Sequence, residues 1–272
     1  MIIHDKFIFF HNGHCGGNTV RKLLKNMFPR ARHFSLKSGH WHKPIRALYK
    51  DDYWGRKVEG ITSDDKDKIK FGYVRNPWDW YVSFYYHQKK SNGLFYKTYT
   101  KKGADDFITF TTNLLSPEYN SHHESVLFYP LGDARTEPVR LCRLLSAWDY
   151  GFFTFCFIYT FFKNSFEIFN NEINLRPDTF SSELTADDIL KTEDLFDELL
   201  NFFGRHNIKP EYEGLPVRLY TNFMMHIKNI RINKYRRKRP HYSHYYNDKL
   251  RELVLNKDRF LIDKYHYSFE QK

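Results

Sequence analysis

The feature that most constrains the fold is a change of pattern near the N-terminus. A short apolar run at residues 6–11 (KFIFFH) leads into a glycine-rich stretch at residues 12–17 (NGHCGG), and a segment with apolar residues at helical spacing follows. Those apolar residues are Val20, Leu23, Leu24 and Met27. A strand, a tight loop and a helix in this order predict the start of a parallel β-α-β unit, whose ligands bind at the carboxyl ends of the strands.

A second segment repeats this order. Residues 70–75 (KFGYVR) are a strand candidate, after which Asn76 can cap a helix and Pro77 suits the first helical position. The helix is expected to run to about His87. Two such units predict an α/β fold with a central parallel sheet flanked by helices.

The remainder of the chain is mostly helical in pattern. Further helices are expected at residues 104–113, within 141–170, at 192–206 and at about 248–264. A strand end is expected at residues 184–191. Residues 1–11 read as a strand rather than as a leader peptide. Because no repeat or flexible linker interrupts the chain, we predict one domain over residues 1–272 with a largely helical middle segment.

The net charge of +11 is unevenly distributed. Residues 1–100 carry a net +11, residues 101–215 a net −9 and residues 216–272 a net +9. If the two basic ends fold together, they form one electropositive site for an acidic small ligand, with the acidic middle on its other side; solvated surface charge is the alternative. A nucleic-acid-binding protein more often shows one continuous basic face, so no nucleic-acid partner is expected.

Cysteine usage and apolar content suggest the compartment. Cys15, Cys142 and Cys156 are scattered and odd in number, which predicts no disulfide framework and favours a reducing environment. The longest apolar run, residues 151–162, is shorter than the roughly 20 residues that cross a bilayer, and is expected to be a buried helix. We therefore expect a cytoplasmic protein without a membrane span.

The glycine loop has the composition of an anion site. Its glycines allow successive N–H groups to converge where the positive end of the next helix points, and Thr19 adds a hydroxyl. A diglycine after a strand is also common as a simple tight connection, so the loop alone is weak evidence. It lacks the G-x-x-x-x-G-K-[ST] pattern, which disfavours an ATP-type P-loop.

Arg75 and Ser83 are the second pair of candidate anion ligands. Arg75 closes the second strand with a planar donor group that suits phosphate, and Ser83 lies about two turns into the following helix. The alternative is that Arg75 pairs only with an acidic neighbour and that Ser83 lies on a solvated face.

Two segments resemble sulfotransferases that use 3′-phosphoadenosine 5′-phosphosulfate (PAPS). Residues 7–24 (FIFFHNGHCGGNTVRKLL) resemble their 5′-phosphosulfate loop, commonly HxPKTGGTS, and residues 70–87 (KFGYVRNPWDWYVSFYYH) resemble their 3′-phosphate motif, commonly FVRNPxDRxVSxY. The second match is the specific one, with these positions in register: Arg75, Asn76, Pro77, Asp79, Val82, Ser83 and Tyr85. Weaker similarity occurs at residues 191–195 (KTEDL) and within 239–269.

The resemblance implies a P-loop-like nucleotide-binding core with PAPS as donor and adenosine 3′,5′-bisphosphate as product. Donor-binding segments would be residues 6–28, 70–87 and 231–269, and the acidic segment 101–215 would lie on the acceptor side. Arg75 and Ser83 would hold the 3′-phosphate, assisted by Arg239. The 5′-phosphosulfate would lie on His14, Cys15, Gly16, Gly17, Asn18 and Thr19.

One departure from the family concerns catalysis. His14 aligns with the loop lysine that contacts the bridging oxygen and the sulfonate, and a histidine is a weaker, pH-dependent substitute unless Lys22 or another basic side chain supplies the charge. The implied reaction is in-line transfer of a sulfuryl group to a hydroxyl or amine, with a general base on the acceptor side. Candidate bases are His40 and His42, which lie where related glycan sulfotransferases place histidines, His42 being slightly favoured.

The acceptor and two alternative functions stay open. A small metabolite or a carbohydrate is expected, and the acidic middle favours a neutral or cationic acceptor. A nucleotide kinase using the loop for ATP is one alternative, which the missing lysine and the missing Mg²⁺-binding carboxylates disfavour. A catalytically inactive nucleotide-binding homologue is the other, and His14 is its best support. The histidine pairs lack zinc-site spacing, so no metal is expected, and the oligomeric state is open.

Overall fold

Five strands form one mixed sheet, in the order β3-β1-β2-β4-β5. The computed structural model describes residues 1–33, 45–49, 62–100, 106–116, 150–169, 176–211 and 239–270. The strands are β1 (Ile2–Ile3), β2 (Phe7–Phe9), β3 (Arg32–His33), β4 (Ile69–Val74) and β5 (Asp188–Lys191). With helices on its sides, the sheet confirms the predicted α/β class.

The parallel part of the sheet is its centre and one edge. β4 runs parallel to β2 and β5, with Phe9 opposite Phe71 and Tyr73 opposite Leu190. The other edge differs from the predicted parallel sheet, because β1 is antiparallel to both β2 and β3. Residues 1–11 are therefore two strands, joined by a turn in which the N–H of His4 donates to the carbonyl of Phe7 at 2.9 Å. Polar residues in this turn divide two apolar pieces, and pairing them buries both.

The helices largely match the sequence periodicity. They are α1 (Gly17–Met27), α2 (Pro77–Lys90), α3 (Leu94–Tyr99), α4 (Phe107–Leu115), α7 (Phe152–Phe161), α8 (Ser165–Phe169), α9 (Pro177–Glu183), α10 (Leu195–Arg205), α12 (Asp248–Lys257) and α13 (Arg259–Lys264). Three 3₁₀ turns are η2 (Ile45–Leu48), η3 (Ser63–Asp67) and η6 (Tyr242–Tyr245). The helix predicted over 248–264 is broken at Asp258, because that residue turns its carboxylate inward to Tyr81 and Thr154.

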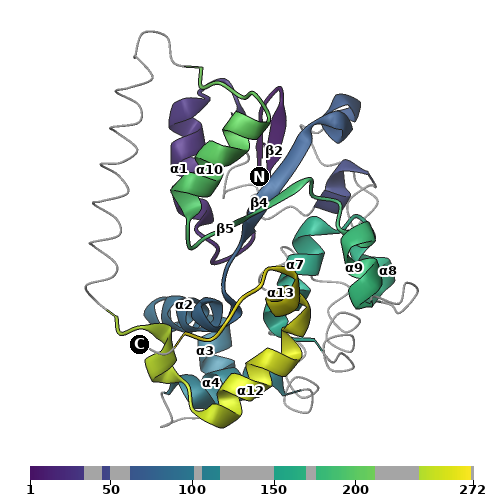
Figure 1. The fold of residues 1–272 in the computed structure, drawn as a ribbon. Helices are drawn as coiled ribbons and strands as arrows, with labels where there is room; N and C mark the ends of the chain where they lie inside the picture. Colours follow the sequence, from purple (N-terminus) through teal and green to yellow (C-terminus); the bar gives the residue numbers. More distant parts are fainter. Residues whose placement is uncertain are drawn as a thin grey trace.

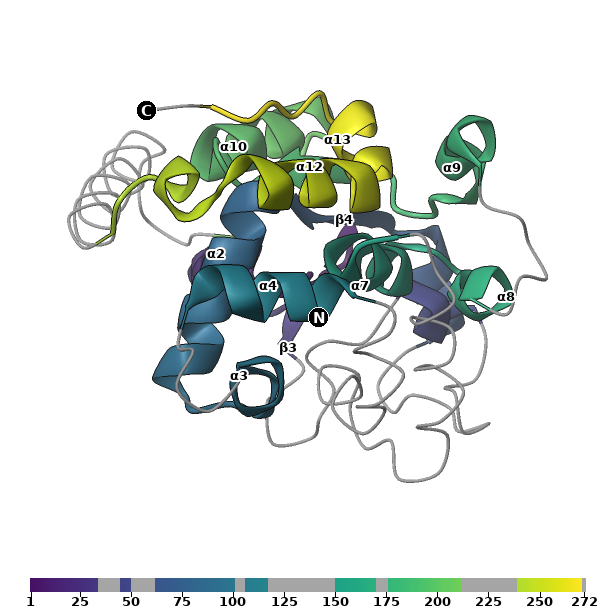
Figure 2. The ribbon, with the colours of Figure 1, turned by 90° about the horizontal axis from the view of Figure 1, so that it is seen from below.

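Two helical groups cover different parts of the sheet. α1 and α10 lie together beside the strands, where Phe7 packs edge-on against Phe202 and Phe71 stacks on Phe202 at 4.2 Å (Figure 1). Beyond the carboxyl end of β4, α2, α3 and α4 form a second group with α12, which runs alongside α4 (Figure 2). Trp80 of α2 stacks on Phe153 of α7 at 4.6 Å, so α7 packs against this group. The turn between β4 and α2 therefore joins the sheet to the helical group.

The helices of the described ranges are short or carry polar residues. None of them is long and apolar enough to cross a bilayer. The most apolar, α7, has a buried residue at most of its positions and packs within the core, as predicted for residues 151–162.

Candidate functional site

The glycine loop connects β2 to the first turn of α1. Gly16 precedes the helix with φ 72°, a left-handed conformation that favours glycine, and a Cβ there would come within 2.5 Å of Leu195 Cδ1. A Cβ at Gly17 would collide with the buried ring of His11. Gly17 is therefore required by space, and Gly16 chiefly by its backbone angle, because the nearby Leu195 methyl is the end of a flexible side chain.

The N-terminus of α1 has the electrostatic character predicted for an anion site. No side chain caps this end of the helix, and its first turn contains no acidic residue. Within the described residues, the N–H groups of Gly17 and Asn18 donate to no protein acceptor, as expected for the first turn of a helix. These donors and the helix dipole favour an anion at this point. The Cys15 thiol is buried, and burial raises its pKa well above the ordinary value, so the side chain is neutral.

Arg75 joins the second motif to this loop. Its Nη1–H donates to the carbonyl of His14 at 3.0 Å, and its Nε–H and Nη2–H donate to Asp79 Oδ2 at 2.8 and 2.6 Å. Partial burial disfavours the charged guanidinium, but Asp79 outweighs this effect and raises the pKa of Arg75. The two predicted donor segments thus meet, and Arg75 also pairs with an acidic neighbour, which the sequence offered as the alternative.

A hydrogen bond from the helix strengthens the same junction. The indole N–H of Trp80 donates to the carbonyl of Gly13 at 2.8 Å. Trp80 was not among the predicted site residues, and a buried tryptophan in an aromatic helix gives no sequence signal for such a contact. The backbone carbonyls of Gly13 and His14 therefore both accept hydrogen bonds from side chains of residues 70–87.

Ser83 and Arg239 follow Arg75 along one side of α2. Ser83 is one helical turn beyond Asp79 and half-buried, and its hydroxyl makes no hydrogen bond to another described residue. The Arg239 guanidinium lies 4.2 Å above the ring of Tyr86, a further turn along the helix. Ser83 thus lies on the α2 face of Asp79, the residue that binds Arg75, and Arg239 lies over Tyr86 further along that helix.

The side chain of His14 packs on the neighbouring side of α2. Its ring lies edge-on to Phe84 at 5.1 Å and to His87 at 4.9 Å, and 5.9 Å from Trp80. His14 adopts φ 61°, which is uncommon for a residue with a Cβ. The imidazole at the position that resembles the loop lysine is thus held against α2, the helix that follows Arg75.

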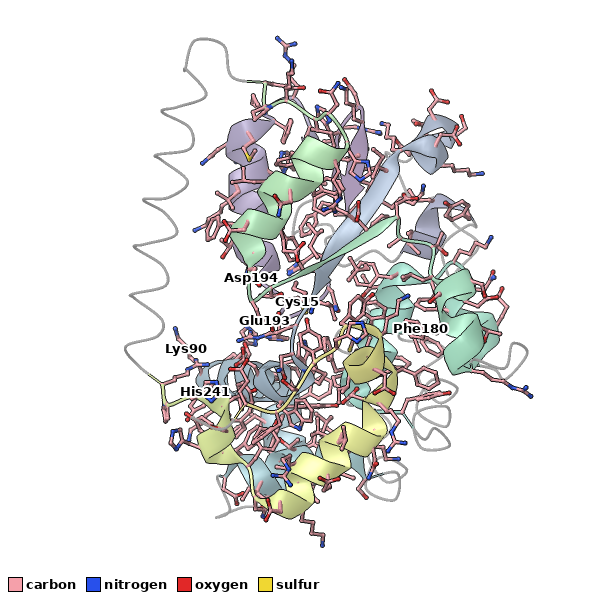
Figure 3. The ribbon with its side chains drawn as sticks, viewed as in Figure 1. Cys15, Lys90, Phe180, Glu193, Asp194 and His241 are labelled. Carbon is pink, nitrogen blue, oxygen red and sulfur yellow. The ribbon has the colours of Figure 1, made fainter. Side chains whose placement is uncertain are left out.

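The segment 191–195 closes the site from β5. The N–H and hydroxyl of Thr192 both donate to the carbonyl of Val74, at 2.9 and 2.8 Å. Glu193 accepts from the N–H of Asn76 at 2.7 Å and from the hydroxyl of Tyr267 at 3.2 Å. Cys15, Glu193 and Asp194 lie together near the strand ends (Figure 3). The loop after β2, the start of α2, the segment after β5 and the C-terminal segment that carries Tyr267 thus converge where β2, β4 and β5 end.

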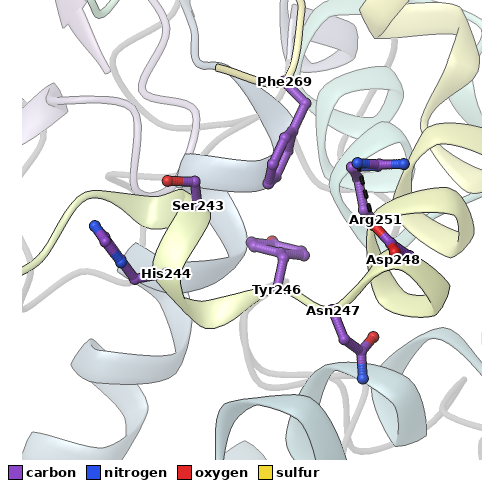
Figure 4. Close-up of a pocket in the computed structure, with 7 residues that line it drawn as sticks. All are labelled: Ser243, His244, Tyr246, Asn247, Asp248, Arg251 and Phe269. Carbon is purple, nitrogen blue, oxygen red and sulfur yellow. Dashed lines mark ion pairs between the residues drawn. The ribbon is translucent and has the colours of Figure 1, made fainter. Parts of the chain in front are cut away.

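The C-terminal segment holds the start of α2 and contains a pocket. Asn76 Nδ2–H donates to the carbonyl of Ser268 at 3.1 Å, and Trp78 Nε1–H to that of Arg251 at 3.2 Å. The nearby pocket has a volume of about 260 Å³ and lies within the predicted donor-binding segment 231–269, but none of the individual residues predicted to bind the donor lines it (Figure 4). Its lining residues are Ser243, His244, Tyr246, Asn247, Asp248, Arg251 and Phe269. Arg251 pairs there with Asp248 at 3.2 Å, so its charge is already balanced.

Two predictions fall outside the part of the chain that the structure describes. His40 and His42, the candidate bases, lie in residues 34–44. Cys142 and most of the acidic segment 101–215 before residue 150 also lie outside the described ranges. Among the residues inside those ranges, no group of three or more His, Cys, Asp or Glu side chains is arranged to hold a metal ion.

Comparison with protein-family models, with curated proteins and with solved structures found no match for this chain.

Proposed function

We propose that the chain is a sulfotransferase that moves a sulfuryl group from PAPS to a hydroxyl or amine of a small metabolite or a carbohydrate. The observation that carries the proposal is the hydrogen bond from Arg75 to the carbonyl of His14, because it joins the two segments that resemble the donor motifs. A single PAPS molecule then contacts residues 7–24 with its 5′-phosphosulfate and residues 70–87 with its 3′-phosphate.

Each end of the donor has matching groups in this arrangement. The uncapped N-terminus of α1 offers N–H groups of Gly17 and Asn18 to the 5′-phosphosulfate. Arg75 uses three of its N–H groups on His14 and Asp79, and its other two meet no acceptor among the described residues, so we assign them to the 3′-phosphate. Ser83 adds a hydroxyl on the same helix face.

The proposed transfer depends on charge stabilisation at the leaving phosphate. In an in-line displacement the sulfur–oxygen bond to the acceptor forms as the bond to the 5′-phosphate breaks, and negative charge grows on the phosphate oxygen. The α1 N-terminus and the His14 imidazole lie at this end of the site. The acceptor proton passes to a base, for which His40 and His42 are the proposed candidates.

Calorimetry with adenosine 3′,5′-bisphosphate tests the proposal directly. Arg75→Ala is expected to weaken binding by at least tenfold, because a phosphate loses a charged, partly buried partner. Arg259→Ala is the matched control, since Arg259 is exposed at the start of α13 and donates only to Asn256 of the preceding helix α12 among the described residues. Equal affinities for the Arg75 variant and the wild-type protein would contradict the assignment, and ATP turnover without PAPS dependence would favour the kinase.

One observation favours a second candidate, a nucleotide-binding protein without transfer activity. The side chain at the lysine position is packed against Phe84 and His87 on α2. Incubation with radiolabelled PAPS and a mixed acceptor pool separates the two: label transfer supports the enzyme, and binding without transfer supports the inactive homologue.

A further inference from the structure

The imidazoles of His14 and His87 form a pair beside the glycine loop. Their ring centroids lie 4.9 Å apart, with the ring planes inclined by 69°. His14 comes from the loop and His87 from the last turn of α2. Nothing in the sequence distinguishes His87 from the other histidines, so only the fold reveals this pair.

The charged groups around the pair limit the number of protons it holds. Partial burial, and then the charge of Lys90, lower the pKa of His87. Arg75 binds the His14 carbonyl, and Asp79 balances the charge of that guanidinium. Phe84 and Trp80, two described rings that pack against His14, are uncharged. Two imidazolium ions at this separation repel each other, so the second proton binds less readily than the first.

We propose that His14 and His87 act as one coupled imidazole pair, whose single proton charges the glycine loop and makes nucleotide binding there depend on pH. This inference rests on the proposed function, because it assigns a regulation to the same site. A lysine keeps its charge throughout the physiological range, whereas an imidazole loses its charge near neutral pH. His87 is a positioning residue here, since it acts through His14.

The first experiment follows the imidazole resonances of the free protein by NMR between pH 5 and pH 9. His87→Gln removes a like charge and is expected to raise the titration midpoint of His14. His87→Lys adds a permanent charge and is expected to lower that midpoint by about one pH unit. His244→Gln, at an exposed histidine of the C-terminal segment, is the control and should leave the midpoint unchanged. Because the partly buried His87 side chain still reaches solvent, both substitutions are compatible with folding.

Opposite shifts support electrostatic coupling, because a purely structural role of His87 would move the midpoint in the same direction for both variants. If the His14 midpoint shifted equally in both variants, or did not shift, the proposed coupling of His14 and His87 would be wrong. This experiment uses no nucleotide, so its result does not depend on the proposed function.

The second experiment measures the affinity for adenosine 3′,5′-bisphosphate at pH 6, 7 and 8. The wild-type protein is expected to bind about tenfold more weakly at pH 8 than at pH 6, as the pair loses its proton. His14→Gln should bind more weakly at pH 6 and lose this dependence, while His87→Lys should move it to lower pH. Affinity that does not vary with pH would overturn the inference but leave the proposed function intact. No binding at any pH would overturn the proposed function, and with it the regulation of nucleotide binding.

Discussion

The guanidinium of Arg75 donates a hydrogen bond of 3.0 Å to the carbonyl of His14, a residue 61 positions earlier in the chain. The same guanidinium is bound on its other side by Asp79, at 2.6 Å. Arg75 thus holds the glycine loop and the start of α2 in one fixed arrangement. An incoming phosphate would share this guanidinium with Asp79.

That competition gives the first prediction. Asp79→Asn removes a negative charge beside Arg75 and is expected to tighten binding of adenosine 3′,5′-bisphosphate about three- to tenfold, with the gain falling as salt is added. Calorimetry at two ionic strengths measures it, and Asp263→Asn, an exposed position on α13, is the control. Weaker binding by the Asp79 variant would mean that Asp79 orients Arg75 rather than competing for it.

The loop backbone gives the second prediction. Gly16→Ala places a Cβ at φ 72° and within 2.5 Å of Leu195 Cδ1, so it should lower the free energy of unfolding by about 1–3 kcal/mol. Gly13→Ala is a matched control in the same loop, because nothing lies within 4 Å of its added Cβ and its φ is not positive. Urea unfolding measures both variants, and equal stability losses would contradict the strain at Gly16.

Two tryptophans of α2 give the third prediction. Trp80→Phe removes the hydrogen bond to the Gly13 carbonyl, and Trp78→Phe removes the one to the Arg251 carbonyl. Each should cost about 1–2 kcal/mol of unfolding free energy, because a partly buried carbonyl loses its donor. Only Trp80→Phe should also weaken adenosine 3′,5′-bisphosphate binding, since its partner lies in the loop. Similar losses of affinity in both variants would show that the loop contact has no special role.

The fourth prediction concerns stability and pH. Asp258 is buried, and its carboxylate accepts from Tyr81 at 2.7 Å and from the N–H and hydroxyl of Thr154 at 2.8 and 2.7 Å. Burial raises the pKa of Asp258 from 3.8 to about 6, despite these hydrogen bonds. The folded state therefore binds this proton more tightly than the unfolded state. The stabilisation that protonated Asp258 gives the folded state is complete below about pH 4 and is lost as the pH rises through 6.

Asp258→Asn tests this sign. The wild-type protein should lose roughly 2–4 kcal/mol from this group between pH 4 and pH 7, and the variant should lack that part of the dependence. Urea unfolding of both proteins across this range gives the difference curve. Parallel curves would mean that the carboxyl does not titrate there. Asparagine keeps the acceptor for Thr154, so the comparison uses a folded protein.

Local sequence signals determined most of the helices and the parallel centre of the sheet. Asn76 caps α2 by accepting from the N–H of Trp78, and Pro77 begins the helix, both as the sequence predicts. The glycine loop could also be predicted from the sequence, because a left-handed residue before a helix favours glycine. These features depend on neighbours along the chain, so a single sequence contains the information.

Tertiary structure decided which distant groups meet. The antiparallel edge, the break at Asp258 and the pairing of His14 with His87 each depend on contacts between segments far apart in the chain. A buried polar group takes the partner that packing brings within hydrogen-bond distance, and no periodicity or cap encodes that choice. The sequence by itself thus determined the elements and the candidate anion loop. Only the folded chain determined that Arg75, Trp80 and Glu193 would converge on the strand ends, because burial and hydrogen-bond geometry are properties of the packed molecule.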